Sequence, residues 1–252
     1  MSSFEPGESR WIDRLGNLRN VIRQELIARQ LSPEVRNGMT VLDVGCGQGT
    51  QVLRLASAGC RVTGVDPSEE LLKLCSDRAA SEGLDIELLR GRISDLDELF
   101  ADRRFDLVCC HGLFMYLDAR RAPLKALFDR LQVGGRVSIT FRNANALAMR
   151  PGLRGEWGKA LEAFDSASYV NDLGLPAMAD RFDDIEAHLR ATGLKIINWY
   201  GVKVLNDAIS ADTPIPSDAE LALLLDAEQR ACEIDPYRMM GSQFHVIAGS
   251  ST

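Results

Sequence analysis

The stretch Thr40–Thr50, TVLDVGCGQGT, limits what this chain can become more than any other part of it. A short apolar run at Val41–Val44 leads into a segment with glycine at every second position, and a helical pattern follows. Glycine lets the backbone turn tightly and lets a ligand lie against it without meeting a Cβ atom. The first N–H groups of the following helix have no intrahelical partner. The stretch therefore predicts a buried strand that ends in a ligand-binding turn.

The spacing of the glycines and a nearby acid indicate which ligand the turn binds. Gly45, Gly47 and Gly49 form G-x-G-x-G, not the G-x-G-x-x-G that binds a pyrophosphate in dinucleotide enzymes. Asp43 adds a carboxylate beside the turn, which suits a cation better than a phosphate. S-adenosylmethionine (SAM) carries a sulfonium, an ammonium and a carboxylate, so this combination points to SAM. A turn with a purely structural role is the alternative.

A second acid strengthens the cofactor interpretation. The β-branched run Cys60–Asp66 predicts a second strand that ends in a carboxylate. At this place in a doubly wound sheet, an acid can accept both ribose hydroxyls of an adenosine. Pro67 and Ser68 then end the strand and cap the next helix. We expect Asp66 to bind the ribose and Pro67 to border the cofactor; a simple helix cap is the alternative for Asp66.

Length and composition exclude several classes of protein. A chain of 252 residues is suited to one α/β domain with an elaboration. No apolar run reaches the ~18 residues that a membrane span needs, and the N-terminus lacks the apolar core of a secretory signal. The six cysteines lack metal-ligand spacing, and His188 and His245 are isolated in sequence. We expect a cytoplasmic protein with no metal site and no membrane contact; the oligomeric state is not predicted.

The net charge of −7 is unevenly distributed along the chain. The segment Asp207–Asp235 contains eight acids and one base, Arg230. The segment Arg136–Lys159 contains five bases and one acid, Glu156. A polyanion such as a nucleic acid could meet the basic segment, although a solvated loop would have the same composition.

The remaining pattern alternates between strands and helices. Apolar residues at helical spacing predict an amphipathic helix over Glu8–Gln30. Further strands are predicted over Ile86–Gly91, Phe105–His111, Arg136–Phe141, Lys195–Val204 and Gln243–Ala248, and further helices over Gln51–Ala58, Ser68–Glu82, Arg120–Leu131, Phe182–Thr192 and Asp218–Cys232. This alternation predicts an α/β fold with a doubly wound, mostly parallel seven-stranded sheet. Residues 1–252 then form a single domain, with an N-terminal helical cap over residues 1–37.

One long segment, residues 143–180, interrupts the alternation after the fifth strand. It contains Pro151, Pro176 and several glycines, and it shows no strand pattern. A long insertion on the ligand side of a sheet is usually functional, so we interpret it as a lid over the pocket of the acceptor substrate. Basic and aromatic residues in or next to it could bind a nucleotide by phosphate contact and stacking, namely Arg142, Arg150, Arg154, Trp157 and Tyr169. An ordinary loop is the alternative.

With these motifs in view, the sequence resembles the class I SAM-dependent methyltransferases, whose fold is Rossmann-like. VLDVGCGQG, VTGVDPS, FDLVCCHGLFMYL and the Gly-Gly pair before SITFRN occur in the family's order. Within that class the chain is similar to the bacterial tRNA 5-carboxymethoxyuridine methyltransferases through GNLRN, HGLFMY, FRNANALAM, GVKVLND and DPYRMMGSQFHV. It departs from them at LPAMADR, where they carry a lysine-rich run. The resemblance implies methyl transfer to the side-chain carboxylate of a modified wobble uridine in tRNA.

The resemblance also implies roles for individual residues. Arg19 matches an arginine that binds the cofactor, and His111 matches a histidine beside it. Lys203 falls where the family carries a basic residue implicated in tRNA contact. The other matches all concern the cofactor: Gly45 and Cys46 at the turn, Asp66 at the ribose, and Ile93 and Ser94 beside the adenine.

The chemistry that follows needs little from the protein beyond alignment. A carboxylate acceptor, with an ordinary pKa of ~4, is ionised at neutral pH and needs no general base. Arginine, lysine or tyrosine should hold it. No catalytic residue is predicted, and the candidates for positioning the acceptor are His111, Tyr116, Arg142 and Tyr237. Two alternatives stay open: an O- or N-methyltransferase for a small molecule, and a relative that binds SAM or its product S-adenosylhomocysteine (SAH) without transfer.

Overall fold

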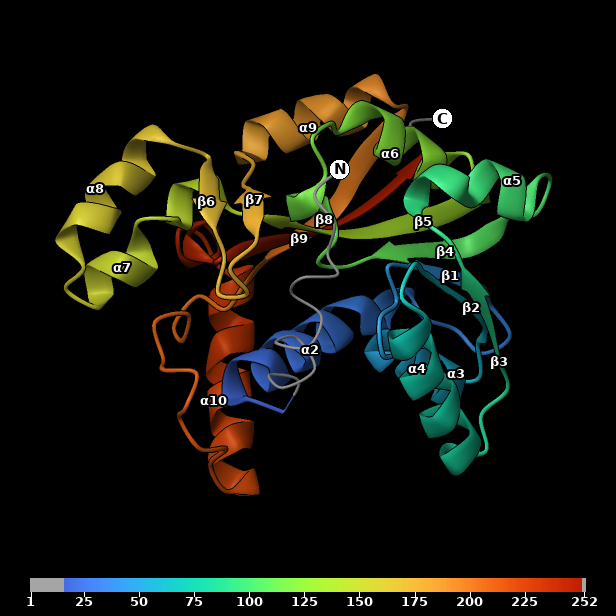
Figure 1. Ribbon diagram of the computed structural model, residues 1–252, viewed down its shortest axis with the longest axis horizontal. Coiled ribbons are helices and arrows are strands. Elements are labelled where there is room, and N and C mark those ends of the chain that lie inside the picture. Colours follow the sequence, from blue (N-terminus) through green and yellow to red (C-terminus); the bar gives the residue numbers. More distant parts are fainter. Residues whose placement is uncertain (1–15, 251–252) are drawn as a thin grey trace.

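A computed structural model describes residues 16–250 of the chain. In this part, seven strands form one sheet in the order β3-β2-β1-β4-β5-β9-β8 (Figure 1). The strands are β1 (Thr40–Val44), β2 (Arg61–Asp66), β3 (Ile86–Arg90), β4 (Phe105–Cys110), β5 (Leu131–Arg142), β8 (Leu194–Val202) and β9 (Gln243–Ser250). Strands β1 to β5 pair in parallel, and β9 runs antiparallel to both β5 and β8. The predicted mostly parallel seven-stranded sheet is confirmed.

Helices cover both faces of the sheet (Figure 1). One face carries α5 (Leu96–Phe100), α6 (Arg121–Phe128) and α9 (Phe182–Ala191), and the other carries α2 (Leu18–Leu31), α3 (Thr50–Ser57), α4 (Glu69–Glu82) and α10 (Asp218–Glu233). The first layer packs buried residues such as Leu124 and Leu189 against the sheet. On the second face, Ile22 and Leu26 of α2 pack with Leu225 of α10. The parallel strands β1, β2 and β4 in the middle of the sheet are therefore almost fully buried.

The N-terminal helix is shorter than predicted. Its expected first part, residues 8–15, lies outside the described residues. Helix α2 begins at Leu18 because Asn17 is its N-cap, with the side chain accepting a hydrogen bond from the backbone N–H of Asn20 at 2.9 Å. The chain therefore enters α2 through a turn at residues 16–17, and the predicted continuous helix over Glu8–Gln30 is wrong at this point.

The glycine-rich turn joins β1 to α3 as expected. Gly45, Gly47 and Gly49 all have positive φ angles, a conformation that side-chain-bearing residues rarely adopt. Gly49 is the N-cap of α3, and a Cβ atom added there would lie 2.1 Å from Sγ of Cys75. Gly45 and Gly47 are different, because Cβ atoms added to them would approach no described atom closer than 3.6 Å. The positive φ angles therefore account for Gly45 and Gly47, whereas Gly49 also permits the close packing of α3 against α4.

Strand β5 begins earlier than predicted, at Leu131 instead of Arg136. Leu131 pairs with Phe105 of β4, and the register then shifts before Leu107 pairs with Arg136. The glycines at 134 and 135 therefore lie within an irregular part of the strand, not in a turn before it. Helix α6 accordingly ends at Phe128.

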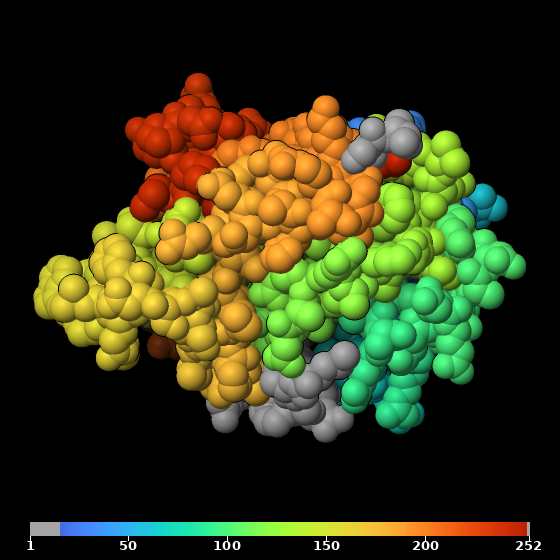
Figure 2. Space-filling model, turned by 90° about the horizontal axis from the view of Figure 1, so that it is seen from above, coloured from blue at the N-terminus to red at the C-terminus, as the bar shows by residue number. Residues whose placement is uncertain are grey.

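The insertion at residues 143–180 is regular, although no strand was predicted there. It contains α7 (Met149–Leu153), α8 (Trp157–Asp165) and a hairpin of β6 (Ser168–Val170) and β7 (Pro176–Met178). Asn143 and Asp180 form a bridge that closes the segment at its base, and Arg120 holds Asp180 through two buried hydrogen bonds. Figure 2 shows the insertion projecting from one side of the molecule. Because these contacts join residues that are far apart in the chain, no local sequence pattern predicts them.

Short 3-10 helices complete the described chain. They are η2 (Ser32–Glu34), η3 (Ile93–Asp95), η4 (Phe114–Tyr116), η5 (Ala144–Ala146) and η6 (Tyr237–Met240). Two of them, η3 and η4, follow β3 and β4 and therefore stand at the carboxyl edge of the sheet. None of the helices in residues 16–250 is long and apolar enough to cross a membrane.

Candidate active site

A cavity of about 1330 Å³ opens at the carboxyl ends of β1, β2 and β4. Its wall includes the glycine-rich turn, Asp66, His111, one side of α2 and part of the insertion. Pockets for one small ligand are typically about 300–1,000 Å³. The cavity is therefore large enough for a cofactor together with part of a second substrate.

Asp66 is held in a fixed orientation at the edge of the cavity. Its Oδ2 accepts a hydrogen bond from the backbone N–H of Gly47, and its Oδ1 accepts one from the N–H of Ser68, both at 2.9 Å. Ser68 in turn caps α4 by accepting from the N–H of Leu71. The carboxylate thus links the glycine-rich turn to the start of α4 and lies where a ligand in the turn can reach it.

Asp43 lies on β1, next to the strand that carries Asp66. Its carboxyl group is in a different electrostatic environment from that of Asp66. Burial, with a further contribution from the charge of Asp66, raises the pKa of Asp43 to about 7. The carboxyl group belongs to the wall of the cavity and is only 3% exposed. A cation in the cavity would favour its ionised form, because opposite charges at short distance lower the pKa of an acid.

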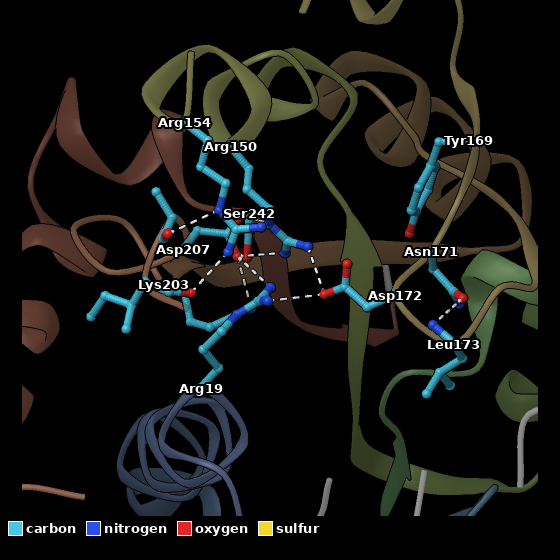
Figure 3. A network of polar contacts seen from close by, with 12 residues as sticks. Arg19, Arg150, Arg154, Tyr169, Asn171, Asp172, Leu173, Lys203, Asp207 and Ser242 are labelled. Atoms are coloured by element: carbon cyan, nitrogen blue, oxygen red, sulfur yellow. Dashed lines mark hydrogen bonds and ion pairs between the residues drawn. The ribbon is translucent and has the colours of Figure 1, made fainter. Parts of the chain in front are cut away.

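A cluster of cationic side chains that line the cavity surrounds Asp207 (Figure 3). Arg150 donates from Nε to Oδ2 of Asp207 at 3.0 Å and from Nη2 to Oδ1 at 2.9 Å, a bidentate pair. Lys203 donates to Oδ1 of Asp207 at 2.8 Å. Arg19 and Arg142 lie slightly farther away, at 3.8 and 4.0 Å. We call Arg19, Arg142, Arg150 and Lys203 the cation cluster.

A second carboxylate reaches the cation cluster from the insertion. Asp172 lies between β6 and β7, and its Oδ2 accepts hydrogen bonds from Arg19 and Arg150, each at 2.9 Å. Its side chain is 47% exposed, whereas that of Asp207 is 10% exposed. Four cationic groups therefore share two carboxylates, one buried and one at the surface of the cavity. The excess positive charge attracts an anion to this side of the cavity.

The pKa shifts of the cluster agree with this arrangement. Burial alone would raise the pKa of Asp207, but Lys203, Arg142 and Arg150 hold it well below its ordinary value. Burial lowers the pKa of Lys203 to about 7, assisted by Arg150 and Arg19 and opposed by Asp207. Asp207 is thus a permanent anion at neutral pH, and it stabilises the charge on Lys203.

Tyr116 also lines the cavity. Its hydroxyl accepts a hydrogen bond of 2.8 Å from the side-chain amide of Asn171, which lies in the hairpin of the insertion. Burial raises the pKa of Tyr116 to about 12. The phenol therefore stays protonated at neutral pH and can act only as a neutral hydrogen-bonding group.

Comparison with known proteins identifies the family. A family model described as a methyltransferase domain matches residues 41–135, which contain the glycine-rich turn and Asp66. The tRNA 5-carboxymethoxyuridine methyltransferase of Escherichia coli K12 is 25% identical over 242 residues, which cover 92% of this chain and 88% of that protein. The chain is a SAM-dependent methyltransferase.

Further relatives show how widely the likeness extends. The ubiquinone biosynthesis O-methyltransferase of Xanthomonas axonopodis pv. citri is 26% identical over 209 residues, covering 80% of this methyltransferase and 82% of that one. The crystal structure of magnesium protoporphyrin IX methyltransferase from Synechocystis PCC 6803 with bound SAH has a TM-score of 0.65 at 17% identity and covers 97% of this chain and 94% of that one. The last comparison supports the class I fold.

The wall of the cavity fits the cofactor of this methyltransferase. Gly45 and Gly47 line the cavity and carry no side chain, so a ligand can lie against their backbone. The two buried carboxylates of Asp43 and Asp66 stand on the same side as the turn, which suits a ligand that carries positive charge and hydroxyl groups. In the described residues no three His, Cys, Asp or Glu side chains gather as a metal site would require.

Most residues predicted for the site do line the cavity. They are Arg19, Asp43, Gly45, Cys46, Gly47, Asp66, Pro67, Ile93, His111, Tyr116, Arg142, Arg150, Arg154, Tyr169 and Lys203. The cavity thus brings together residues from α2, the sheet edge, the insertion and the segment after β8. Their individual roles remain predictions.

Four predicted residues lie outside the wall of the cavity. Gly49 packs against α4, and the hydroxyl of Ser94 bonds to Asp95 at 2.8 Å. Trp157 and Tyr237 are 69% and 56% exposed on α8 and η6. The sequence predicted all four near the ligand. In the structure, Gly49 lies where α3 packs against α4, and Ser94, Trp157 and Tyr237 are exposed at the surface.

Two important acids of the site were not predicted. Asp207 was counted with the acidic C-terminal segment, and Asp172 falls in the insertion, where no element was expected. The spacing of Lys203 and Asp207, four residues apart, was the available signal, because such pairs can form ion pairs. Nothing in the sequence around Asp172 indicated its partners, which lie far away along the chain.

Proposed function

We propose that this methyltransferase methylates a carboxylate, and that its acceptor is the carboxymethoxy group of a modified wobble uridine in tRNA. The observation that carries the proposal is the cation cluster on the same cavity as the glycine-rich turn. A carboxylate needs cationic partners to hold it, and arginine offers two parallel N–H donors that match its geometry. The relative from E. coli with this named activity spans nearly the whole chain.

In this proposal a separate set of residues, Asp66, Asp43 and Arg19, binds the cofactor. SAM supplies an electrophilic methyl group bound to sulfur. Asp66, already oriented by two backbone N–H groups, accepts the ribose hydroxyls. Asp43 faces the positively charged part of the cofactor, and Arg19 binds its carboxylate.

The acceptor side needs alignment more than acid–base chemistry. Arg142, Arg150 and Lys203 hold the ionised acceptor carboxylate, which is already nucleophilic at neutral pH. The buried Asp207 keeps these three cations gathered at one place. Asp172 is the more exposed of the two acids, so its contacts with Arg19 and Arg150 are those that an incoming carboxylate replaces most easily. The rate gain comes from proximity and from the exclusion of water.

The composition of the basic segment Arg136–Lys159 suggested a simple exposed face for tRNA. In this proposal its arginines contribute in a different way. Arg142 and Arg150 are engaged inside the cavity, and Arg154 donates to the carbonyl groups of Ala208 and Ile209. Two exposed aromatic side chains of the insertion, Trp157 and Phe164, lie on α8. In the proposal, Trp157 stacks on a base of the anticodon loop while the modified side chain enters the cavity.

The decisive experiment incubates the protein with methyl-labelled SAM and bulk tRNA. We expect label in the tRNA that mild alkali releases, because an ester forms on the nucleoside. The Arg150→Ala variant should lose most of this activity, whereas Arg121→Ala, which changes an exposed arginine of α6, should keep it. Alkali-stable label in tRNA, or label found only in small molecules, would contradict the proposal.

A hydroxyl-bearing small molecule is the second candidate acceptor. It is favoured by the relatives named ubiquinone biosynthesis O-methyltransferases and by Nδ1 of His111, which has no hydrogen-bond partner within residues 16–250. The same assay with a pool of phenolic metabolites in place of tRNA distinguishes the two acceptors. Transfer to a phenol that survives the Arg150→Ala change would favour this candidate.

A further inference from the structure

A continuous chain of hydrogen bonds connects the cavity with the N-terminal helix through the middle of the sheet. Nε2 of His111 lies 2.8 Å from Oγ of Ser138, and this Oγ lies 2.8 Å from Nε2 of His245. Nδ1 of His245 lies 2.8 Å from Oε1 of Gln30, whose Nε2 donates to the carbonyl of Gly201 at 3.1 Å. Ser138 and His245 are completely buried.

The direction of donation is fixed at the end farthest from the cavity. The carbonyl oxygen of Gly201 can only accept, so the amide nitrogen of Gln30 must face it. The amide oxygen of Gln30 then faces His245 and can also only accept. Nδ1 of His245 must therefore carry a hydrogen.

The same logic continues to His111. Burial lowers the pKa of His245 to about 3, so its ring is neutral and Nε2 holds a lone pair. The hydroxyl of Ser138 has one hydrogen, which it donates to this lone pair. The oxygen of Ser138 is then left to accept from His111, so the hydrogen of the His111 ring sits on Nε2.

The other nitrogen of His111 is consequently an acceptor. Burial, together with His245 and Arg23, lowers the pKa of His111 well below its ordinary value, so the ring is neutral and Nδ1 holds a lone pair. This atom is shielded from solvent and has no hydrogen-bond partner among the described residues, while the side chain lines the cavity. Buried polar atoms without a partner are rare in folded proteins.

We propose that Gln30, His245 and Ser138 are positioning residues that hold His111 as its Nε2–H tautomer, so that Nδ1 accepts a hydrogen bond from an N–H or O–H group of a bound ligand. The proposal deepens the proposed function, on which it rests for the ligands. A carboxylate has no hydrogen to donate. The donor is therefore either the ammonium group of the cofactor or a hydroxyl or amino group of the acceptor.

Nitrogen-15 NMR of the imidazole rings tests the tautomers without any catalysis. The chain has three histidines, so each ring can be assigned by substituting it in turn. We expect His245 with its hydrogen on Nδ1 and His111 with its hydrogen on Nε2 in the ligand-free protein. A hydrogen on Nδ1 of His111, or rapid exchange between the two tautomers, would overturn the proposal even if methyl transfer to tRNA were established.

Two additions then identify the donor. SAH is added first, followed by SAH with the nucleoside 5-carboxymethoxyuridine. A shift of the Nδ1 signal toward its hydrogen-bonded position on adding SAH assigns the donor to the cofactor, and a shift that appears only with the nucleoside assigns it to the acceptor. An Nδ1 signal that moves with neither addition, while calorimetry shows that both bind, contradicts the proposal.

Substitutions along the chain separate positioning from general stability. Ser138→Ala and Gln30→Leu each break the chain, whereas Ser138→Thr keeps a hydroxyl that can donate to His245 and accept from His111. We expect both breaking variants to allow both tautomers of the His111 ring and to weaken binding of the donor ligand about tenfold, as for the loss of one hydrogen bond. Ser138→Thr should retain the tautomer and the affinity. A folded Ser138→Ala or Gln30→Leu protein with an unchanged His111 tautomer would refute the role of the chain.

Discussion

Asp43 and Asp66 show how two acids only a strand apart can differ in chemical character. Asp66 accepts two backbone hydrogen bonds, which fix the orientation of its carboxylate. For Asp43 burial dominates and the neighbouring charge of Asp66 adds to it, so its proton is retained up to about pH 7. One acid is thus oriented for hydroxyl groups, and the other responds to positive charge in the cavity.

Replacing Asp66 by alanine should remove most of the affinity for the cofactor. Two charge-assisted hydrogen bonds to ribose hydroxyls would be lost, so we expect a decrease of about 100-fold or more in the binding constant for SAH, measured by calorimetry. Asp77→Ala, which changes an exposed acid of α4, is the matched control. Near-normal affinity in folded Asp66→Ala protein would show that this carboxylate does not bind the ribose.

Asp43 should make the stability of the ligand-free protein decrease as the pH rises. Its folded-state pKa of about 7 exceeds the ordinary value of 3.8, so between these values the folded state holds a proton that the unfolded state has lost. The free energy of unfolding then falls as pH rises through this window, by up to about 4 kcal/mol in total. Urea unfolding at pH 5, 6, 7 and 8 measures this change.

The comparison that isolates Asp43 is the Asn variant, which has no titrating proton. The difference in unfolding free energy between Asp43→Asn and the unchanged protein should move in favour of the variant as the pH rises from 5 to 8, because contributions of all other groups cancel. A difference that is constant across this range would mean that Asp43 is ionised throughout.

Helix α7 and the hairpin of β6 and β7 are the elements that complete the cation cluster. Arg150 of α7 contacts both Asp207 and Asp172, so it joins the insertion to the segment after β8 and to the hairpin. Arg154 adds hydrogen bonds to the same segment. The insertion is therefore fastened to the cavity by one face of a short helix, and its position depends on these charges.

Reversing the charge of Arg150 should impair the use of tRNA more than the binding of the cofactor. A glutamate would face two carboxylates, so repulsion would separate α7 from Asp207 and remove a partner of the acceptor. We expect Arg150→Glu to raise the Michaelis constant for tRNA at least tenfold, as loss of about one charged hydrogen bond implies. The affinity for SAH should change less, since Arg150 bonds to Asp207 and Asp172, whereas Asp66 is held by Gly47 and Ser68.

Arg121→Glu on α6 is the control for a general effect of charge on tRNA binding. If both variants raise the Michaelis constant equally, long-range electrostatics and not the insertion explains the change. If neither changes it, Arg150 does not serve the acceptor.

Elements with a local signature were predictable, and elements held by distant partners were not. The glycine-rich turn, Ser68 as a helix cap and the buried strand β4 follow from neighbouring residues alone. The hairpin of β6 and β7 was missed because its ends are fixed by remote contacts, such as that between Asp180 and Arg120. The site follows the same division: Asp66 was predictable from its strand, whereas Asp172 acquires its partners only in three dimensions.

Across the whole molecule, the acidic C-terminal segment proves to support the site. None of the residues of α10 lines the cavity. Glu228 of α10 is buried and accepts hydrogen bonds from the backbone N–H groups of Val204 and Leu205 and from the side chain of Asn206. These three residues lie between Lys203 and Asp207. The segment that carries Lys203 and Asp207 is thus held in place by a helix that does not itself line the cavity.

Removing the carboxylate of Glu228 should therefore disturb both stability and acceptor use. Glu228→Ala removes the acceptor of three donors, of which the Asn206 amide is buried and two backbone N–H groups are partly buried, so we expect the free energy of unfolding to fall by about 3 kcal/mol in urea titrations. Because the loop over residues 204–206 joins Lys203 to Asp207, the Michaelis constant for tRNA should rise in the same variant while SAH affinity changes little. Glu228→Gln, which keeps one accepting oxygen, should lie between the two proteins in both measurements. A large loss of stability with unchanged tRNA kinetics would mean that the cation cluster keeps its geometry independently of α10.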